Sequence, residues 1–257
     1  VTTSSALTTL NNFSSFSEGF GQNGLRNFSS LLGRDSVFTI DYDAIKTESY
    51  LWAYGCGGGN YAGASGIGNQ NGFANDSMQS VFTMHFGSYF GDWDHPSNNY
   101  LRAALASGTI LTNAWAGRPN WFFYPMGMGL PIGVCARMTM NNNSSYHSSG
   151  SAVKGIHIAL MGDPTLKMYV TKAPSALTIN ESPSGLQLAW NAPSEPVDGY
   201  FLYATTTGID SFAQVGGLIQ GAQFTYPQPA LDSTYIFRLQ AVQFLTTPSG
   251  SFYNPSH

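Results

Sequence analysis

Residues Val81 to Asp94 read VFTMHFGSYFGDWD, and this stretch carries the strongest fold signal in the chain. An apolar run from Val81 to Met84 leads into a glycine-punctuated turn that bears His85 and Ser88. The pattern predicts a buried strand whose carboxyl end delivers side chains into a loop. In open α/β sheets, ligands and catalytic groups gather where neighbouring strands end in such loops.

A second stretch of the same form lies upstream. Leu51 to Tyr54 is an apolar run, and it breaks into the glycine-rich sequence GCGGG around Cys56. We predict that this run and Val81 to Met84 form neighbouring parallel strands. One loop carries a thiol and the other carries the imidazole of His85, which makes them the chemically suggestive pair of loops in the chain.

The composition restricts the class of protein. With 257 residues, the chain can bury one large core or two ordinary ones. Charged residues make up only 9% of it, against about a quarter in ordinary globular domains. Asn, Ser, Thr, Gln and Gly must therefore supply the polar surface, which fits an extracellular protein or one packed into an assembly. The net charge of −4 argues against a nucleic-acid partner.

Targeting and cysteine content add further expectations. No apolar run approaches the ~18 residues of a membrane span, so we expect no span. The chain begins at Val1 without a signal pattern, so we expect a processed leader or a piece of a larger precursor. Cys56 and Cys135 could pair in an oxidising compartment. Asn-x-Ser patterns weakly favour surface exposure at Asn12, Asn27, Asn75, Asn142, Asn143 and Asn180.

A break near Thr171 to Ser175 divides the chain into predicted domains at residues 1–171 and 172–257. In the first, strand and helix patterns alternate, which predicts an α/β fold with a mostly parallel sheet and helices on both faces. Asn98 to Ala106 has the best helical pattern, with Asn98 or Asn99 as N-cap and Gly108 as the stop. Further elements are expected at 24–32, 37–43, 49–55, 109–115, 121–128, 155–160 and 166–170.

The second domain consists of short runs that alternate apolar and polar residues, with turn signals between them. They are LQLAW, GYFLYAT, FTYPQ and TYIFRLQAVQ. Trp190 in the second strand, and Tyr235 early in a late strand and four residues after Leu231, resemble a fibronectin type III sandwich. In that all-β, immunoglobulin-like fold the tyrosine hydroxyl bonds back to the preceding corner. Such modules usually space or dock neighbouring domains.

The order of elements in residues 35–170 resembles the C-terminal portion of a gingipain-type, caspase-like cysteine peptidase domain. The segments that carry the resemblance are GCGGG, FGSYFGDWD, TNAWAGRP and LMGDPTLKMY. In that family one strand ends in a Gly-His-Gly turn with the catalytic imidazole, and the next ends in a turn with the nucleophilic cysteine. A Gly-Asp-Pro-(Ser/Thr)-Leu segment then precedes an immunoglobulin-like module, as Gly162 to Leu166 does here.

The catalytic motif departs from the family pattern. This chain has Cys56 where the family has histidine, and its next strand ends in His85-Phe86-Gly87 where the family has cysteine. The resemblance therefore implies exchanged roles, with Cys56 as nucleophile and His85 as base. The backbone N–H groups of Gly57 and Gly58 would form the oxyanion hole. The alternative is that Cys56 and His85 are buried core residues of a scaffold without peptidase function.

Other polar residues have both a functional and a structural interpretation. Ser88 is either a nucleophile or, more simply, a turn-capping hydroxyl. Asp92, Asp94 and His95 are candidate ligands for a cation, and carboxylates and carbonyls suit calcium. The structural alternative is an ordinary turn, in which Asp and Pro are common. No other cofactor is implied. Three further residues are expected to brace a loop, cap a turn and lie in the core, respectively: Arg118, Asp163 and His157.

We therefore expect a secreted or cell-surface protein with a gingipain-like fold, in which cysteine endopeptidase activity is lost or unproven. The alternative is a non-enzymatic structural or adhesive component of an extracellular assembly or the cell envelope. Its partners would be proteins, peptides or neighbouring copies of itself, since many aromatic residues suit protein contacts.

Overall fold

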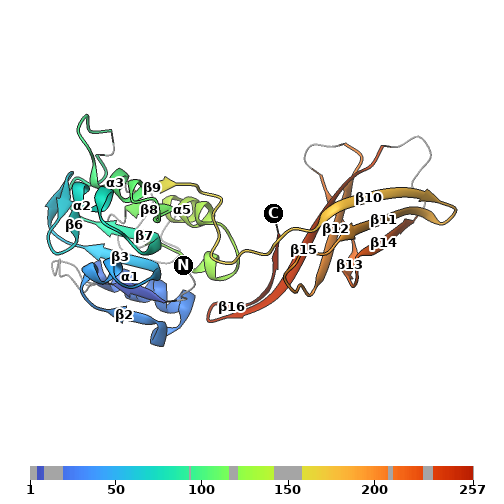
Figure 1. Ribbon diagram of the computed structural model, residues 1–257, viewed down its shortest axis with the longest axis horizontal. Helices are drawn as coiled ribbons and strands as arrows, with labels where there is room; N and C mark the ends of the chain where they lie inside the picture. Colours follow the sequence, from blue (N-terminus) through green and yellow to red (C-terminus); the bar gives the residue numbers. More distant parts are fainter. Residues whose placement is uncertain are drawn as a thin grey trace. The chain divides into compact units, whose positions relative to one another are not determined.

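The computed structural model of this chain describes residues 5–8, 20–92, 94–115, 121–141, 158–207, 211–227 and 234–256. The chain divides into two compact units (Figure 1). The first comprises residues 1–168 with 247–250, and the second comprises residues 169–246 with 251–257. The division lies close to the break expected near Thr171.

A six-stranded sheet forms the centre of the first unit, in the order β2-β1-β3-β7-β8-β9 (Figure 1). The pairs β1–β2, β1–β3, β3–β7 and β7–β8 are parallel, and β9 runs antiparallel to β8. The sheet is therefore mostly parallel, as the alternation of strand and helix patterns predicted. Its strands are β1 (Ala6–Thr8), β2 (Val37–Thr39), β3 (Tyr50–Cys56), β7 (Ser80–Phe86), β8 (Thr112–Trp115) and β9 (Ala159–Gly162).

Helical segments cover both faces of this sheet, because both faces carry apolar side chains that need burial. Against one face pack α1 (Phe20–Leu32), α4 (Tyr124–Gly127) and α5 (Ile132–Met140). Against the other pack η2 (Tyr42–Lys46), α2 (Gln70–Asn75) and α3 (Tyr100–Ala106). The remaining elements are η1 (Arg34–Ser36) and a small separate sheet of β4 (Gly59–Asn60), β5 (Gly63–Ala64) and β6 (Gly68–Asn69).

The two strands that carried the sequence argument are neighbours, as predicted. In β3 and β7, Trp52 pairs with Phe82 and Tyr54 pairs with Met84. All four side chains are buried in the core on the α1 face. The intervening Ala53 lies in the core on the α3 face instead. Near-continuous apolar runs are expected of parallel strands that are buried on both faces.

The expected helix at Asn98 to Ala106 is confirmed, with a small shift. Helix α3 begins at Tyr100, Asn99 is its N-cap, and Gly108 follows it with a φ of 78°. The element expected at 121–128 is confirmed in part, since helix α4 occupies Tyr124–Gly127 and Pro131 separates it from α5. The element expected at 166–170 is wrong, because these residues form no strand and β9 is the strand at that edge of the sheet.

The second unit consists of two antiparallel sheets. One has the order β10-β11-β14 and the other β13-β12-β15-β16. They share a core that includes Leu188 and Trp190 from the first sheet and Tyr200, Leu202 and Ala241 from the second. The strands are β10 (Ser175–Ser182), β11 (Gly185–Asn191), β12 (Gly199–Thr205), β13 (Ala213–Ile219), β14 (Gln223–Pro227), β15 (Ile236–Thr247) and β16 (Gly250–Pro255).

Each of the four predicted strand runs of this unit overlaps an observed strand, namely β11, β12, β14 or β15, and the last run begins two residues before β15. The expected bond from the Tyr235 hydroxyl to the corner near Leu231 lies outside the described residues. The Tyr235 ring itself packs near Tyr226 and Phe237, with ring centroids 5.5 Å and 6.2 Å away. In the part of the chain described here, no helix has the length and apolarity that crossing a bilayer requires.

Candidate functional site

The thiol of Cys56 lies at the end of β3 and is inaccessible. Its side chain is fully buried in the core on the α1 face, among residues that include Tyr54 and Met84. Burial raises the pKa of the Cys56 thiol to about 12, while a hydrogen bond with Tyr54 acts in the opposite direction. A thiol with this pKa is protonated at neutral pH, and a protonated thiol is a poor nucleophile.

His85, near the end of β7, is also fully buried, but on the α3 face. Its Nε2 shares a 2.6 Å hydrogen bond with the hydroxyl of Tyr42 from η2. The rings of Phe73 and Tyr100 lie 5.2 Å and 5.0 Å from its own. Burial lowers the pKa of His85 to about 3, although a hydrogen bond with Asn113 acts in the opposite direction. The imidazole is therefore neutral at physiological pH.

The predicted pairing of Cys56 with His85 is wrong. The register pairs Cys56 with Phe86 and Gly55 with His85. Since successive side chains of a strand point to opposite faces, the one-residue offset sends the thiol and the imidazole to opposite sides of the sheet. The loops are adjacent, as expected, but the two reactive groups are separated by the sheet itself.

The expected oxyanion hole is also not formed at Gly57. The N–H of Gly57 donates to the carbonyl of Phe86, at 3.0 Å, and so continues the β3–β7 ladder. A Cβ at Gly57 would lie 2.3 Å from the carbonyl oxygen of Ser65, so glycine is required there for packing. Gly58 accepts a bond from the Ser65 N–H at 2.8 Å. The glycines thus hold the Ser65 segment against the strand end.

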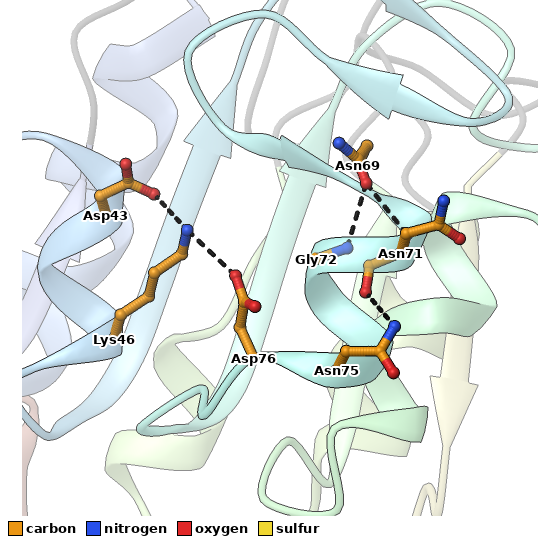
Figure 2. Close-up of polar contacts among 7 residues, drawn as sticks. All are labelled: Asp43, Lys46, Asn69, Asn71, Gly72, Asn75 and Asp76. Atoms are coloured by element: carbon orange, nitrogen blue, oxygen red, sulfur yellow. Dashed lines mark hydrogen bonds and ion pairs between the residues drawn. The ribbon is translucent and has the colours of Figure 1, made fainter.

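Tyr42 of η2 and Phe73 of α2 pack against His85 on one face of the sheet. Polar contacts in these two segments are drawn in Figure 2. Lys46 of η2 lies between Asp43, at 3.1 Å, and Asp76 at the end of α2, at 3.2 Å. The side chain of Asn69 accepts bonds from two N–H groups in the first turn of α2. These contacts are exposed and contribute little energy individually. They link the segments that supply Tyr42 and Phe73, the partners of His85.

The turn after β7 presents Ser88 and Tyr89 to solvent. Tyr89 is 68% exposed and has a φ of 62°, which is rare for an aromatic residue. The carbonyl of Gly87 accepts a 3.3 Å bond from the Trp115 indole. Ser88 therefore lies on a surface turn, away from the buried His85, and the structure brings no base to it among the described residues.

Asn99 holds the turn after β7 in place, a role that the sequence does not predict. Its Oδ1 caps α3 by accepting from the Leu101 N–H at 2.8 Å. Its Nδ2 donates to the carbonyls of Phe90, at 3.2 Å, and Asp92, at 2.9 Å. The Asn99 side chain is fully buried, and its hydrogen bonds connect α3 to the turn after β7. An Asn before a helix predicts only the cap, so the sequence does not predict the two bonds to the carbonyls of Phe90 and Asp92.

This arrangement gives a first prediction, for Asn99→Ala. Loss of the cap and of two buried hydrogen bonds is expected to lower the free energy of unfolding by about 2 to 4 kcal/mol. Asn99→Asp keeps the capping oxygen but not the amide donor, and should therefore lie between the wild type and Asn99→Ala. Urea denaturation followed by circular dichroism measures all three. If Asn99→Asp were as stable as the wild type, the bonds to the loop would contribute nothing.

The residues considered for calcium do not gather into a ligand set. His95 stacks on Tyr61, with centroids 3.8 Å apart, and its Nδ1 accepts from the Ser97 N–H at 3.2 Å. Within the described ranges, no cluster of three or more His, Cys, Asp or Glu side chains suits a metal.

The other singled-out residues are placed as follows. Cys135 is buried in α5, and it forms no disulfide with Cys56. Asp163 caps its turn as expected, since its Oδ1 accepts from the Thr165 N–H and hydroxyl at 2.8 Å and 2.7 Å. Arg118 and His157 lie outside the described residues.

The Asn-x-Ser patterns differ in exposure. Asn27 is buried in α1, where its Nδ2 donates to the Asn23 carbonyl, so the expectation of surface exposure is wrong there. Asn75 and Asn180 are exposed. Three others lie outside the described residues: Asn12, Asn142 and Asn143.

A scan against protein-family models and a search of curated proteins give no match. Among solved structures, the chain is similar to one described as "Crystal structure of domains A168-A170 from titin", at 19% sequence identity. The alignment covers 34% of this chain and 30% of that chain, with a TM-score of 0.26. The chain thus spans less than a third of the titin chain, and the likeness is too low to inform function.

Proposed function

We propose that this chain is a non-catalytic building block of the cell surface or the extracellular space. In this proposal its first unit is a degenerate gingipain-type domain with a caspase-like fold, and its second unit is a fibronectin type III module. The strand order β2-β1-β3-β7-β8 supports the first part, because it follows the doubly wound pattern 2-1-3-4-5. Antiparallel sheets of three and four strands around the buried Trp190 support the second.

The separation of Cys56 from His85 is the observation that carries the proposal. Cysteine catalysis needs a thiolate within hydrogen-bond reach of its base. Here both side chains are fully buried, on opposite faces of one sheet. The raised pKa of Cys56 and the lowered pKa of His85 keep the thiol protonated and the imidazole neutral, so they disfavour a thiolate–imidazolium ion pair. Bringing them together would require a one-residue slip of β3 against β7, which would move every core side chain of one strand to the opposite face of the sheet.

The surface supports a structural or adhesive role over an enzymatic one. Only 9% of the residues are charged, and large apolar side chains stand exposed on both units. Examples are Phe38 at 45% exposure in the first unit and Phe244 at 51% in the second. Such side chains suit contacts with other proteins or with neighbouring copies.

Thiol accessibility tests the proposal. We expect a peptidyl vinyl sulfone and iodoacetamide to leave native protein unmodified, because Cys56 and Cys135 are buried, whereas denatured protein should react at both sites. Labelling is measured by mass spectrometry, beside a peptidase assay on casein. Labelling of native protein that is lost in Cys56→Ala but kept in Cys135→Ala would refute the non-catalytic assignment. The structural role predicts self-association at high concentration in sedimentation experiments, and a strictly monomeric protein would contradict it.

A further inference from the structure

A hollow of about 600 Å³ lies at one end of the second unit. It is formed where β12 ends, β13 begins and β14 ends, so it lies at the end of the two sheets rather than on one face. Tyr235, just before β15, completes its lining. No contact with the first unit is needed to form it.

Small side chains create this hollow. Across β12 and β13, Leu202 pairs with Val215, and both pack in the shared core of the two sheets. The next pair on the same face, the buried Ala204 and the exposed Ala213, offers only methyl groups. Both alanines line the hollow. Large side chains therefore fill the core as far as the Leu202–Val215 pair, and the space beside the Ala204–Ala213 pair stays open.

Two tyrosines form one wall. The rings of Tyr226 and Tyr235 lie 5.5 Å apart at an angle of 56°. Tyr226 also packs edge-on against Phe237, at 5.2 Å, and belongs to the residues packed on the core. The aromatic wall is thus anchored in the core, and it is preorganised for stacking.

Neutral polar groups form the rim. Thr205 and Ser211 line the hollow, and the hydroxyl of Thr207, outside the lining, lies 3.2 Å from that of Thr205 and 3.0 Å from that of Ser211. Thr206 and Gln214 add a further hydroxyl and an amide to the lining. All the described residues that line the hollow are uncharged.

We propose that this hollow binds a neutral sugar ring. The apolar face of a hexose stacks on aromatic rings, and its hydroxyls exchange hydrogen bonds with hydroxyl and amide groups such as those of the rim. A charged ligand would lose hydration without an opposite charge among these groups. The site is independent of the proposed loss of peptidase function, and it gives the second unit a recognition role of its own.

Titration of the full chain with glucose, galactose, mannose and N-acetylglucosamine, and with oligomers of each, tests the proposal. We expect at least one monosaccharide to bind with a Kd on the order of millimolar, as its few heavy atoms allow. Its oligomer should bind at least as tightly. Calorimetry and chemical-shift changes in NMR are the readouts, and the shifts should include the Tyr226 and Tyr235 rings.

Ala213→Leu provides the decisive variant, because the larger side chain fills the hollow at an exposed position. We expect sugar binding to weaken at least about tenfold while the thermal unfolding midpoint stays within a few degrees. Ala189→Leu makes the same change at an exposed site on β11 outside the hollow, and should bind as the wild type does. Absence of binding by every sugar in the panel overturns the proposal. Sugar binding that Ala213→Leu leaves unchanged also overturns it. So does tighter binding of phenylalanine amide than of any sugar, because this control ligand has an aromatic ring and no sugar hydroxyls.

Discussion

Acidification to pH 3 should destabilise the first unit by about 4 kcal/mol through His85 alone, because its pKa falls from an ordinary 6.5 to about 3 in the folded protein. Between these pH values the unfolded chain binds a proton at this residue and the folded chain does not. Stability conferred by the neutral imidazole is therefore complete above about pH 6.5 and decreases as the pH falls toward 3.

His85→Gln is the matched variant for this prediction. Its side-chain amide can keep a hydrogen bond with the Tyr42 hydroxyl but does not titrate in this range. Urea denaturation at half-unit intervals from pH 7 to pH 3 should give a smaller loss of stability for the variant, with the difference growing below pH 6.5. Since Tyr42 and Tyr100 have raised pKa values and stay neutral, they do not contribute to this difference. Parallel pH profiles for the two proteins would show that His85 is not buried in its neutral form.

Trp52→Ala should cost about 3 to 5 kcal/mol of the free energy of unfolding of the first unit, as expected for a large buried aromatic residue. Trp52 is fully buried at the centre of the sheet. Its ring lies 5.0 Å from Phe82, 5.3 Å from Phe28 and 4.6 Å from Phe123. One truncation thus removes contacts to β7, to α1 and to the segment before α4.

Trp52→Phe controls for the aromatic contacts. It should cost clearly less than Trp52→Ala, because a ring remains and the buried indole N–H of Trp52 has no hydrogen-bond partner among the residues that the structure describes. Differential scanning calorimetry separates the two units if they unfold in separate transitions. Trp52→Ala should then shift the first unit's transition and leave that of the unit containing Trp190 unchanged. A loss below about 1 kcal/mol would contradict the packing around β3.

Local patterns in the sequence predicted much of the fold. Apolar runs that end in glycine marked β3 and β7, and period-two alternation marked β11, β12, β14 and β15 of the second unit. The Asn-rich segment before Tyr100 marked the start of α3 within two residues. Each of these signals is short-range, because a strand, a cap or a turn depends on a few consecutive residues. The helix expected at residues 121–128 is present only at Tyr124–Gly127, and residues 166–170 form neither helix nor strand. Aromatic and apolar composition alone does not distinguish a core loop from a helix or strand.

The candidate site was harder to predict from the sequence, because its chemistry depends on the pairing register of β3 and β7. Cys56 and His85 were correctly expected on neighbouring strand ends, but no local pattern states that Cys56 pairs with Phe86. Likewise, the Tyr42 hydroxyl meets His85 across 43 positions of sequence. The hollow beside Ala213 likewise depends on tertiary packing, because Tyr226 and Tyr235 line it together with the β12–β13 pair.

Composition, strand periodicity and glycine turns were thus enough to establish an α/β unit followed by a β-rich unit. The face on which each reactive side chain lies followed only from the packing of the folded chain. The reason is geometric: a side chain's face alternates with every residue, so a single step in strand pairing separates a thiol from an imidazole that the linear order places in adjacent loops.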